Sequence, residues 1–217
     1  MISSGIGSEV RQADREYEAP SEPRGISAEE AGRADVYRLL ALLLEGPPNE
    51  ELRALLIGVA DDGSDLGVAL ARVADAVRGQ DPAWTRDAFG RLFVGAPAAK
   101  LMPYGSHYKS GQLYGRDLAE LRMDLARLGI ARAKDATEPE DHITSLFEIM
   151  SGLLTGAFGA APLDIAEQSA FFAKHVQPWT PRFFRDMEAA AEDEFYHAVA
   201  RFGGAFVALE VEAFDLP

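Results

Sequence analysis

The segment from Thr137 to Met150 reads TEPEDHITSLFEIM, and it decides how the chain is expected to fold. Thr137 and Glu140 have the spacing of a capping box, and Pro139 suits the first turn of a helix. The apolar residues that follow recur at intervals of three and four, which is typical of one buried helical face. They are Ile143, Leu146, Phe147, Met150, Leu153, Leu154 and Phe158. The segment therefore predicts a buried helix that begins near Thr137.

Similar start and stop signals occur along the rest of the chain. Ser27 and Glu30 form another capping-box pair. Asp81 is followed by Pro82, and Gly129 has the position that commonly ends a helix. Helices are predicted from Ser27, over 49–60, 65–78, 81–94 and 116–128, from Thr137, and over 163–175, 181–191 and 193–213. No run alternates with the period of a strand, so we predict an all-α fold of about eight or nine helices.

Two stretches lack this helical pattern. Residues 1–25 are rich in Ser, Glu, Gly and Pro, so we predict a disordered tail there and an all-helical domain over 26–217. Residues 95–115 read GAPAAKLMPYGSHYKSGQLYG, with four glycines, two prolines and three tyrosines. Long loops that carry aromatic side chains are often functional, so this irregular stretch is a candidate binding segment.

Composition and charge exclude several classes of protein. Asp and Glu number 35 against 21 Lys and Arg, a formal net charge of −14, so no nucleic-acid partner is expected. The chain has no cysteine, which excludes disulfides, thiol catalysis and Cys-ligated metals and fits a reducing cytoplasm. The N-terminus lacks the apolar region of a secretory signal. The longest apolar run, Leu39–Leu44, is far too short to span a bilayer, so no stable membrane insertion is expected.

Motifs of catalysis are scarce in this sequence. There is no Gly-Lys dipeptide for a phosphate loop, no H-E-x-x-H and no G-x-S-x-G. One E-x-x-H pair occurs, Glu194 with His197, whereas a di-iron helical bundle needs two. A helical metalloenzyme that combines this pair with His142 and His175 is the alternative function that the residues leave open. Apart from that alternative, no catalytic residue, metal or cofactor is predicted.

Charge is distributed unevenly around TEPEDH. Residues 135–173 hold seven carboxylates and no Lys or Arg, whereas residues 100–134 hold seven basic residues against three acidic ones. Carboxylates in a first helical turn also complement the helix dipole without any further function. Two interpretations therefore stay open. Either the two segments pack together and neutralise each other, or the acidic helix start faces a groove that receives a basic ligand.

The segment QSAFFAKHVQPWTPRFF, residues 168–184, is dense in aromatic side chains. Its members are Phe171, Phe172, Trp179, Phe183 and Phe184. We interpret them as part of the core, because large aromatic side chains dominate buried surfaces. A structural adaptor that uses this helix–turn–helix as an interface is a third alternative.

Four pieces of the sequence together resemble the TorD-like family of molybdoenzyme-specific chaperones, also called redox-enzyme maturation proteins. They are PYGSHY with the following GQLYG, then EPEDHITSLFEIM, QSAFFAKHVQPW and FYHAVARF, and the resemblance covers about residues 33–210. It implies an all-helical fold of two subdomains, about 26–130 and 137–215, joined by a loop. It also implies no catalysis. Members of the family can swap helices between chains, so both a monomer and a helix-swapped homodimer are compatible with the resemblance.

The resemblance also implies a partner. Such proteins bind the N-terminal twin-arginine or related leader of an apo-molybdoenzyme in the cytoplasm until its molybdopterin cofactor is inserted. The client would be the catalytic subunit of an enzyme such as a formate dehydrogenase, a nitrate reductase or an S- or N-oxide reductase. Carried over to this sequence, the family's leader-binding motif falls on Asp141 and His142, with Glu138 and Tyr104 beside them.

The chemistry of these residues suits that role. Asp141 and Glu138, at an exposed helix start, are expected to pair with leader arginines. Tyr104, Tyr108 and Tyr114 are expected to flank the apolar part of the leader or to stack on a guanidinium group. His142 is expected to hold the loop or to titrate near neutral pH.

Overall fold

The computed structural model describes residues 25–95, 99–132, 137–158 and 161–215, and nearly all of the predicted tail lies outside these ranges. The described residues form ten α-helices and no strand, so the all-α prediction is confirmed with one helix more than expected. The helices are α1 (Ala28–Glu45), α2 (Glu50–Ile57), α3 (Asp65–Gly79), α4 (Pro82–Phe93), α5 (Gly105–Ser110), α6 (Arg116–Arg127), α7 (Ile143–Thr155), α8 (Ile165–His175), α9 (Thr180–Ala190) and α10 (Glu194–Asp215). The additional helix is α5, which lies within the stretch predicted to be irregular.

Local capping signals placed several helix ends correctly. Ser27 and Glu30 form the predicted capping box at the start of α1. The Asp81 side chain accepts from the backbone of Ala83 at the start of α4. Gly129 follows α6 with a φ of 72°, a left-handed conformation that glycine adopts at no steric cost.

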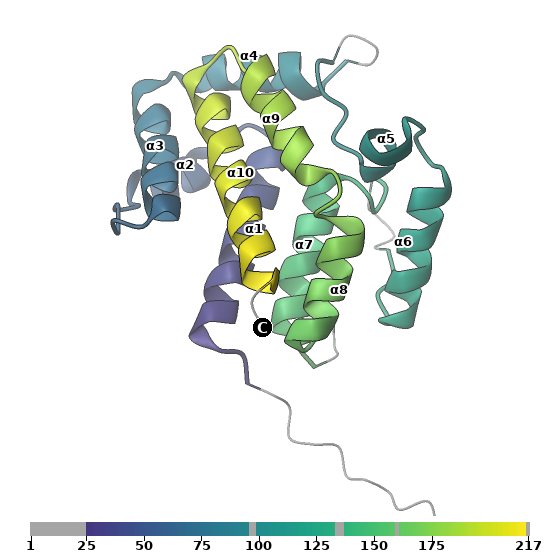
Figure 1. The fold of residues 1–217 in the computed structure, drawn as a ribbon. Helices are drawn as coiled ribbons and strands as arrows, with labels where there is room; N and C mark the ends of the chain where they lie inside the picture. The colour runs from purple at the N-terminus through teal and green to yellow at the C-terminus, as the bar shows by residue number, and fades with distance from the viewer. Residues whose placement is uncertain (1–24, 96–98, 133–136, 159–160, 216–217) are drawn as a thin grey trace, which may run out of the picture.

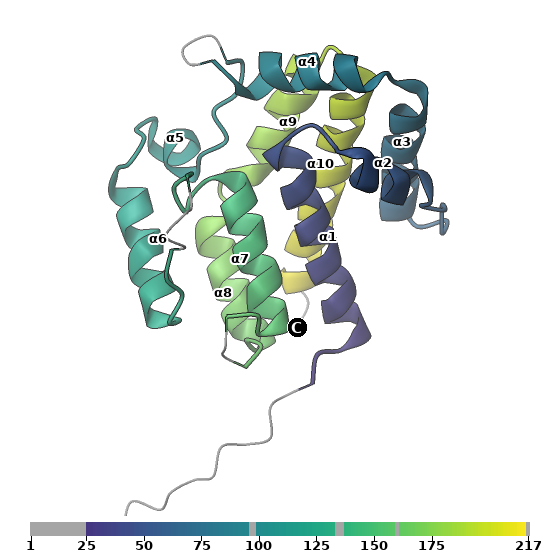
Figure 2. The ribbon, with the colours of Figure 1, turned by 180° about the vertical axis from the view of Figure 1, so that it is seen from behind.

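The longest helices form the centre of the molecule. Helix α1 packs against α7, and α10 packs against both α9 and α3. Figures 1 and 2 show the α2–α3 pair and the α5–α6 pair on opposite sides of this centre. Buried side chains from residues 34 to 207 belong to one hydrophobic cluster. Helices from both predicted subdomains thus contribute to the same core, and the division into two subdomains stays a prediction.

The aromatic helix–turn–helix belongs to this core. Phe171, Phe172, Trp179, Phe183 and Phe184 are all buried, each with an exposed fraction of 6% or less. Trp179 donates from its indole nitrogen to the carbonyl of His175 at 2.9 Å, so its polar atom is also satisfied. The core interpretation is therefore confirmed, and these rings offer no exposed surface to an adaptor's partner.

A buried polar cluster joins the first helix to the last. Both carboxylate oxygens of Glu210 on α10 accept from the Arg33 guanidinium on α1, at 2.7 and 2.9 Å. The Tyr37 hydroxyl donates to the same carboxylate at 2.7 Å. Since Glu210 is 1% exposed, its charge is stable in the core only while these donors are present.

Replacing Glu210 with alanine should destabilise the fold strongly. The change leaves the mostly buried Arg33 without its carboxylate, which costs roughly 3 kcal/mol of unfolding free energy. Urea unfolding followed by circular dichroism measures the loss. The control is Glu212→Ala on the same helix, at an exposed position, which should change stability by less than about 0.5 kcal/mol. Equal effects of the two substitutions would show that the buried pair has no special role.

No helix in the described ranges combines the length and the apolar character needed to cross a membrane.

Candidate functional site

The segment TEPEDH does not begin a helix, contrary to the prediction. Helix α7 begins at Ile143, and His142 is its N-cap residue. The His142 Nδ1 atom accepts from the backbone N–H of Thr144 at 3.3 Å and lies 2.6 Å from that residue's hydroxyl. Before it, the N–H of His142 donates to the carbonyl of Pro139 at 3.0 Å, which closes a turn. The polar residues of the motif therefore lie in a loop before α7 rather than in its first turn.

A contact between distant segments explains why the helix starts late. Tyr104 and His142 form an isolated antiparallel bridge. The N–H of Gly105 donates to the Asp141 carbonyl at 2.8 Å, and the N–H of Ile143 donates to the Pro103 carbonyl at 2.9 Å. These two bonds hold His142 in extended conformation and join the PYGSHY and EPEDH motifs. Capping-box spacing carries no information about such a long-range partner.

Asp141 is buried, so the expectation of an exposed carboxylate at this position is wrong. Its exposed fraction is 4%, and its Oδ2 atom accepts from the backbone N–H of Ser106 at 2.8 Å. This bond satisfies an N–H at the start of α5, a helix whose own N-cap residue, Tyr104, makes no side-chain capping bond. The other oxygen, Oδ1, is also buried and has no hydrogen-bond partner among the described residues. Asp141 thus stabilises α5 from a distance of 35 residues.

Gly105 allows α5 to approach the core closely. A Cβ atom at this position would lie 3.1 Å from the indole nitrogen of Trp179, closer than most real contacts of this kind. Larger side chains are therefore excluded unless Trp179 shifts. Together, the small residue and the cap provided by Asp141 account for a six-residue helix that its own sequence does not predict.

Tyr104, Glu138 and His142 lie together beside this bridge. The Tyr104 hydroxyl donates to the Glu138 carboxylate at 2.7 Å, and its ring meets the His142 ring edge-on at 5.0 Å between centroids. Burial raises the pKa of Tyr104, and the bond to Glu138 raises it further. Burial lowers the pKa of His142 and outweighs the opposite effect of Glu138 and Asp141, so the imidazole is neutral at pH 7. Three of the five predicted site residues are thus brought together.

These three side chains line a groove of about 600 Å³. Its apolar walls come from α4, from the segment after it and from the loop after α5. The main apolar side chains are Phe89, Phe93, Leu101, Met102 and Leu113. Three glutamates lie along its other side, Glu45 at the end of α1, Glu138 in the loop and Glu148 on α7, and we call them the acidic rim.

The acidic rim stands out among the described residues. None of the ion pairs found there includes Glu45, Glu138 or Glu148, while the Arg132 guanidinium donates to the backbone carbonyl of Glu138 at 3.2 Å. Burial raises the pKa of Glu148, and the neighbouring charge of Glu45 raises it further. Two carboxylates that repel each other at the mouth of an apolar groove favour a cationic ligand.

Neighbouring Glu140 has the opposite arrangement. Its carboxylate accepts from the Arg122 guanidinium of α6 at 2.9 and 3.0 Å. The basic and acidic segments therefore do neutralise each other here, as one interpretation of the charge pattern predicted. Glu138, two residues earlier, is exposed, so the second interpretation stays a prediction for this residue.

Tyr108 is not brought to this groove. It packs against Trp179 with 5.5 Å between ring centroids, and the Arg182 guanidinium lies 5.6 Å from its ring centre. Its side chain lines a separate hollow together with Asp186, and burial and that carboxylate raise its pKa.

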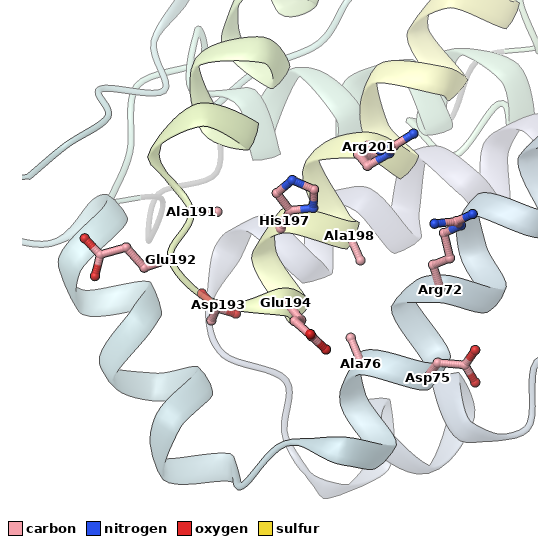
Figure 3. Close-up of a pocket in the computed structure, with 10 residues that line it drawn as sticks. All are labelled: Arg72, Asp75, Ala76, Ala191, Glu192, Asp193, Glu194, His197, Ala198 and Arg201. Atoms are coloured by element: carbon pink, nitrogen blue, oxygen red, sulfur yellow. The ribbon is translucent and has the colours of Figure 1, made fainter.

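The histidines of the metalloenzyme alternative have separate environments. His142 caps α7, and the buried His175 lies 2.8 Å from Asp124 of α6. His197 lies beside Glu194 and Arg201 in a hollow of about 480 Å³ between α3 and the start of α10, shown in Figure 3. Within the described parts of the chain, no three His, Asp or Glu side chains are arranged to hold a metal ion.

Comparison with known proteins assigns the chain to a family. The family model described as the nitrate reductase delta subunit matches residues 60–185, which include both the PYGSHY and the EPEDH motifs. The chain belongs to the nitrate reductase delta subunit family. The resemblance inferred from the sequence is thereby confirmed.

Curated relatives of this family member are chaperones. The TorD chaperone of Aliivibrio fischeri is 28% identical over 200 residues, covering 83% of this chain and 93% of the relative. The Tat proofreading chaperone DmsD of Salmonella typhi is 31% identical over 135 residues, covering 61% of this chain and 63% of the relative. The chain is therefore assigned to the chaperones and not to the enzymes, and the metalloenzyme alternative is rejected.

A solved structure shares the fold. It is described as a redox enzyme maturation protein from Archaeoglobus fulgidus, with a TM-score of 0.55 and 21% identity. The match covers 82% of this chain and 93% of the other. The two proteins therefore share the arrangement of helices reported above.

Sequence reasoning missed two of the three rim carboxylates. Glu148 lies inside the segment that predicted the buried helix. The apolar pattern of that segment predicts which face is buried and carries no signal for a ligand-binding carboxylate on another face. Glu45 ends α1, and only the packing of α1 on α7 brings it near Glu148. No local pattern in the sequence signals that pair.

Asp141→Ala should destabilise α5 selectively. The change leaves the Ser106 N–H without its acceptor, at a cost of about 1–2 kcal/mol. Hydrogen exchange of the α5 amides should accelerate more than exchange in α7, and mass spectrometry of peptic fragments measures it. Asp141→Asn retains a carbonyl acceptor and should protect α5 better than alanine does. Equal exchange in the two variants would show that the hydrogen bond is not what holds α5.

His142 should make stability depend on pH. Its lowered pKa means that the unfolded chain binds a proton more readily, so stability falls as pH decreases below about 6.5. His142→Asn keeps an N-cap acceptor but does not titrate, so its melting temperature should decline less between pH 7 and pH 5. The buried His175, whose pKa burial also lowers, contributes the same slope to both proteins. Identical pH profiles for wild type and variant would contradict this role.

Proposed function

We propose that this chain binds the N-terminal leader of a molybdopterin oxidoreductase catalytic subunit, a twin-arginine signal or a related sequence. In this role it assists insertion of the molybdopterin cofactor before the client is exported or assembled. Family membership supports the chaperone role, and the relatives named TorD and Tat proofreading chaperone DmsD support the class of client. Binding before export would take place in the cytoplasm.

The observation that carries the proposal is the acidic rim beside an apolar groove. A twin-arginine leader offers two fixed cations followed by an apolar stretch that can become helical. Guanidinium groups pair well with carboxylates, and apolar helices bind in apolar grooves. The rim offers three carboxylates that belong to none of the ion pairs found among the described residues, and the groove offers apolar walls of suitable size.

The residues of the site have different parts in this proposal. Glu138 receives a leader arginine, and the Tyr104 hydroxyl fixes the orientation of its carboxylate. His142 caps α7 and keeps the loop in place. Asp141 acts indirectly, because its buried carboxylate holds α5 and so positions Tyr104. A part for Tyr108, in its separate hollow, stays a prediction, as does dimerisation by helix swapping.

Removing the charge of Glu138 should weaken leader binding. The probe is a synthetic peptide with two adjacent arginines followed by about ten leucine and alanine residues, the length of a signal's apolar region. Glu138→Gln should lower its affinity by about tenfold at low salt, because a charge-assisted hydrogen bond is lost. Titration calorimetry measures the affinity, and wild-type binding should weaken as salt increases.

The matched control is Glu212→Gln at an exposed position on α10. It changes the net charge by the same amount as Glu138→Gln but lies away from the groove. It should leave the affinity unchanged. A peptide in which both arginines are replaced by glutamine should bind weakly and without dependence on salt. If Glu138→Gln binds the arginine peptide as tightly as wild type, the assignment of this carboxylate is wrong.

A further inference from the structure

A second hollow adjoins the groove on the other side of the acidic rim. Its volume is about 530 Å³, and it shares Glu138, Ser145 and Glu148 with the groove. Its walls come from α1, α7, the last turn of α6 and the segment after it. We call this second site the apolar hollow, because its main lining side chains are Leu42, Leu125, Ile130, Ile149 and Phe158.

The apolar hollow exposes side chains that a folded protein normally covers. Leu42 of α1 is 45% exposed, and Phe158, which follows α7, is 43% exposed. Ile149, at 7%, is almost fully buried beneath them. Ser151 also lines the hollow at 4% exposure, and its hydroxyl has no hydrogen-bond partner in the described ranges. Exposed apolar walls point to a ligand that is mainly apolar.

We propose that the apolar hollow receives the end of the leader's apolar stretch, so that the peptide crosses the acidic rim from the groove into the hollow. This inference rests on the proposed function and extends it to a second site. The arginines would stay at the rim, and the apolar residues that reach beyond the groove would contact Leu42 and Phe158.

The order of residues along α1 supports this direction. Glu45, Leu42 and Arg38 lie about one turn apart along α1. Read in that direction, the helix presents an acidic, then an apolar, then a basic side chain. Arg38 also lines the hollow and forms no ion pair with any described carboxylate. A leader that begins with arginines and continues as an apolar helix presents the complementary order, since the carbonyls at its helical end carry partial negative charge.

Charge argues against a second copy of this chain as the occupant. Each copy carries a formal net charge of −14, and the rim adds carboxylates at the edge of the hollow. Two such surfaces repel each other, whereas a basic peptide is attracted. The complementary occupant is therefore the leader.

Two peptides and one substitution test the inference. The long peptide carries two adjacent arginines followed by about ten leucine and alanine residues, and the short peptide ends directly after the arginines. Leu42→Ser should weaken the long peptide by about tenfold, because apolar contact area is lost, and should leave the short peptide unchanged. Phe158→Ala should give the same pattern. Both side chains are substantially exposed, so the variants should fold, which circular dichroism checks.

Leu209→Ser is the matched control, because this leucine on α10 is 47% exposed and lines neither the groove nor the hollow. It should affect neither peptide. The inference is overturned if Leu42→Ser weakens both peptides equally or leaves the long one unchanged. It is also overturned if sedimentation shows that the wild type is a dimer and that the only effect of Leu42→Ser is to dissociate this dimer. The proposed function fails separately, if the long peptide does not bind wild type or binds Glu138→Gln equally well.

Discussion

The bridge between residues 103–106 and 141–143 is the constraint on which the candidate site depends. It joins the two motifs by backbone hydrogen bonds, and the Asp141 carboxylate adds a third bond to the start of α5. Without it, neither α5 nor the start of α7 has a complete set of hydrogen bonds. Because Tyr104 and His142 are the paired residues of the bridge, their side chains are held at the groove by the backbone itself.

This constraint also separates two kinds of carboxylate within one short motif. Asp141 is buried and accepts a hydrogen bond from the start of α5, and Glu140 is paired with Arg122. Only Glu138 faces outward, where it joins Glu45 and Glu148 at the rim. A motif that looks uniformly acidic in the sequence therefore divides into carboxylates with partners inside the fold and one that is exposed at the groove. The family's motif gives the position of the site, but the contacts of each side chain decide its part.

Much of the fold follows from local sequence. Capping pairs such as Ser27 with Glu30, and the apolar stripe that became α7, placed most helices, because these signals act within one or two turns. Helix α5 and the late start of α7 were missed, because both depend on a partner about 35 residues away. The candidate site was located by its motifs, whereas the burial of Asp141 and the approach of Glu45 to Glu148 follow only from tertiary packing.

The close approach of Gly105 to Trp179 has a practical consequence. The chain has two tryptophans, and Trp84 is 67% exposed whereas Trp179 is 1% exposed and touches the helix that Asp141 holds. The two indoles therefore differ in polarity of environment, and a quencher dissolved in water reaches only one of them. Any rearrangement of α5 changes the surroundings of the other. The protein thus carries an intrinsic fluorescent reporter next to its groove, and no label is needed to follow the site in solution.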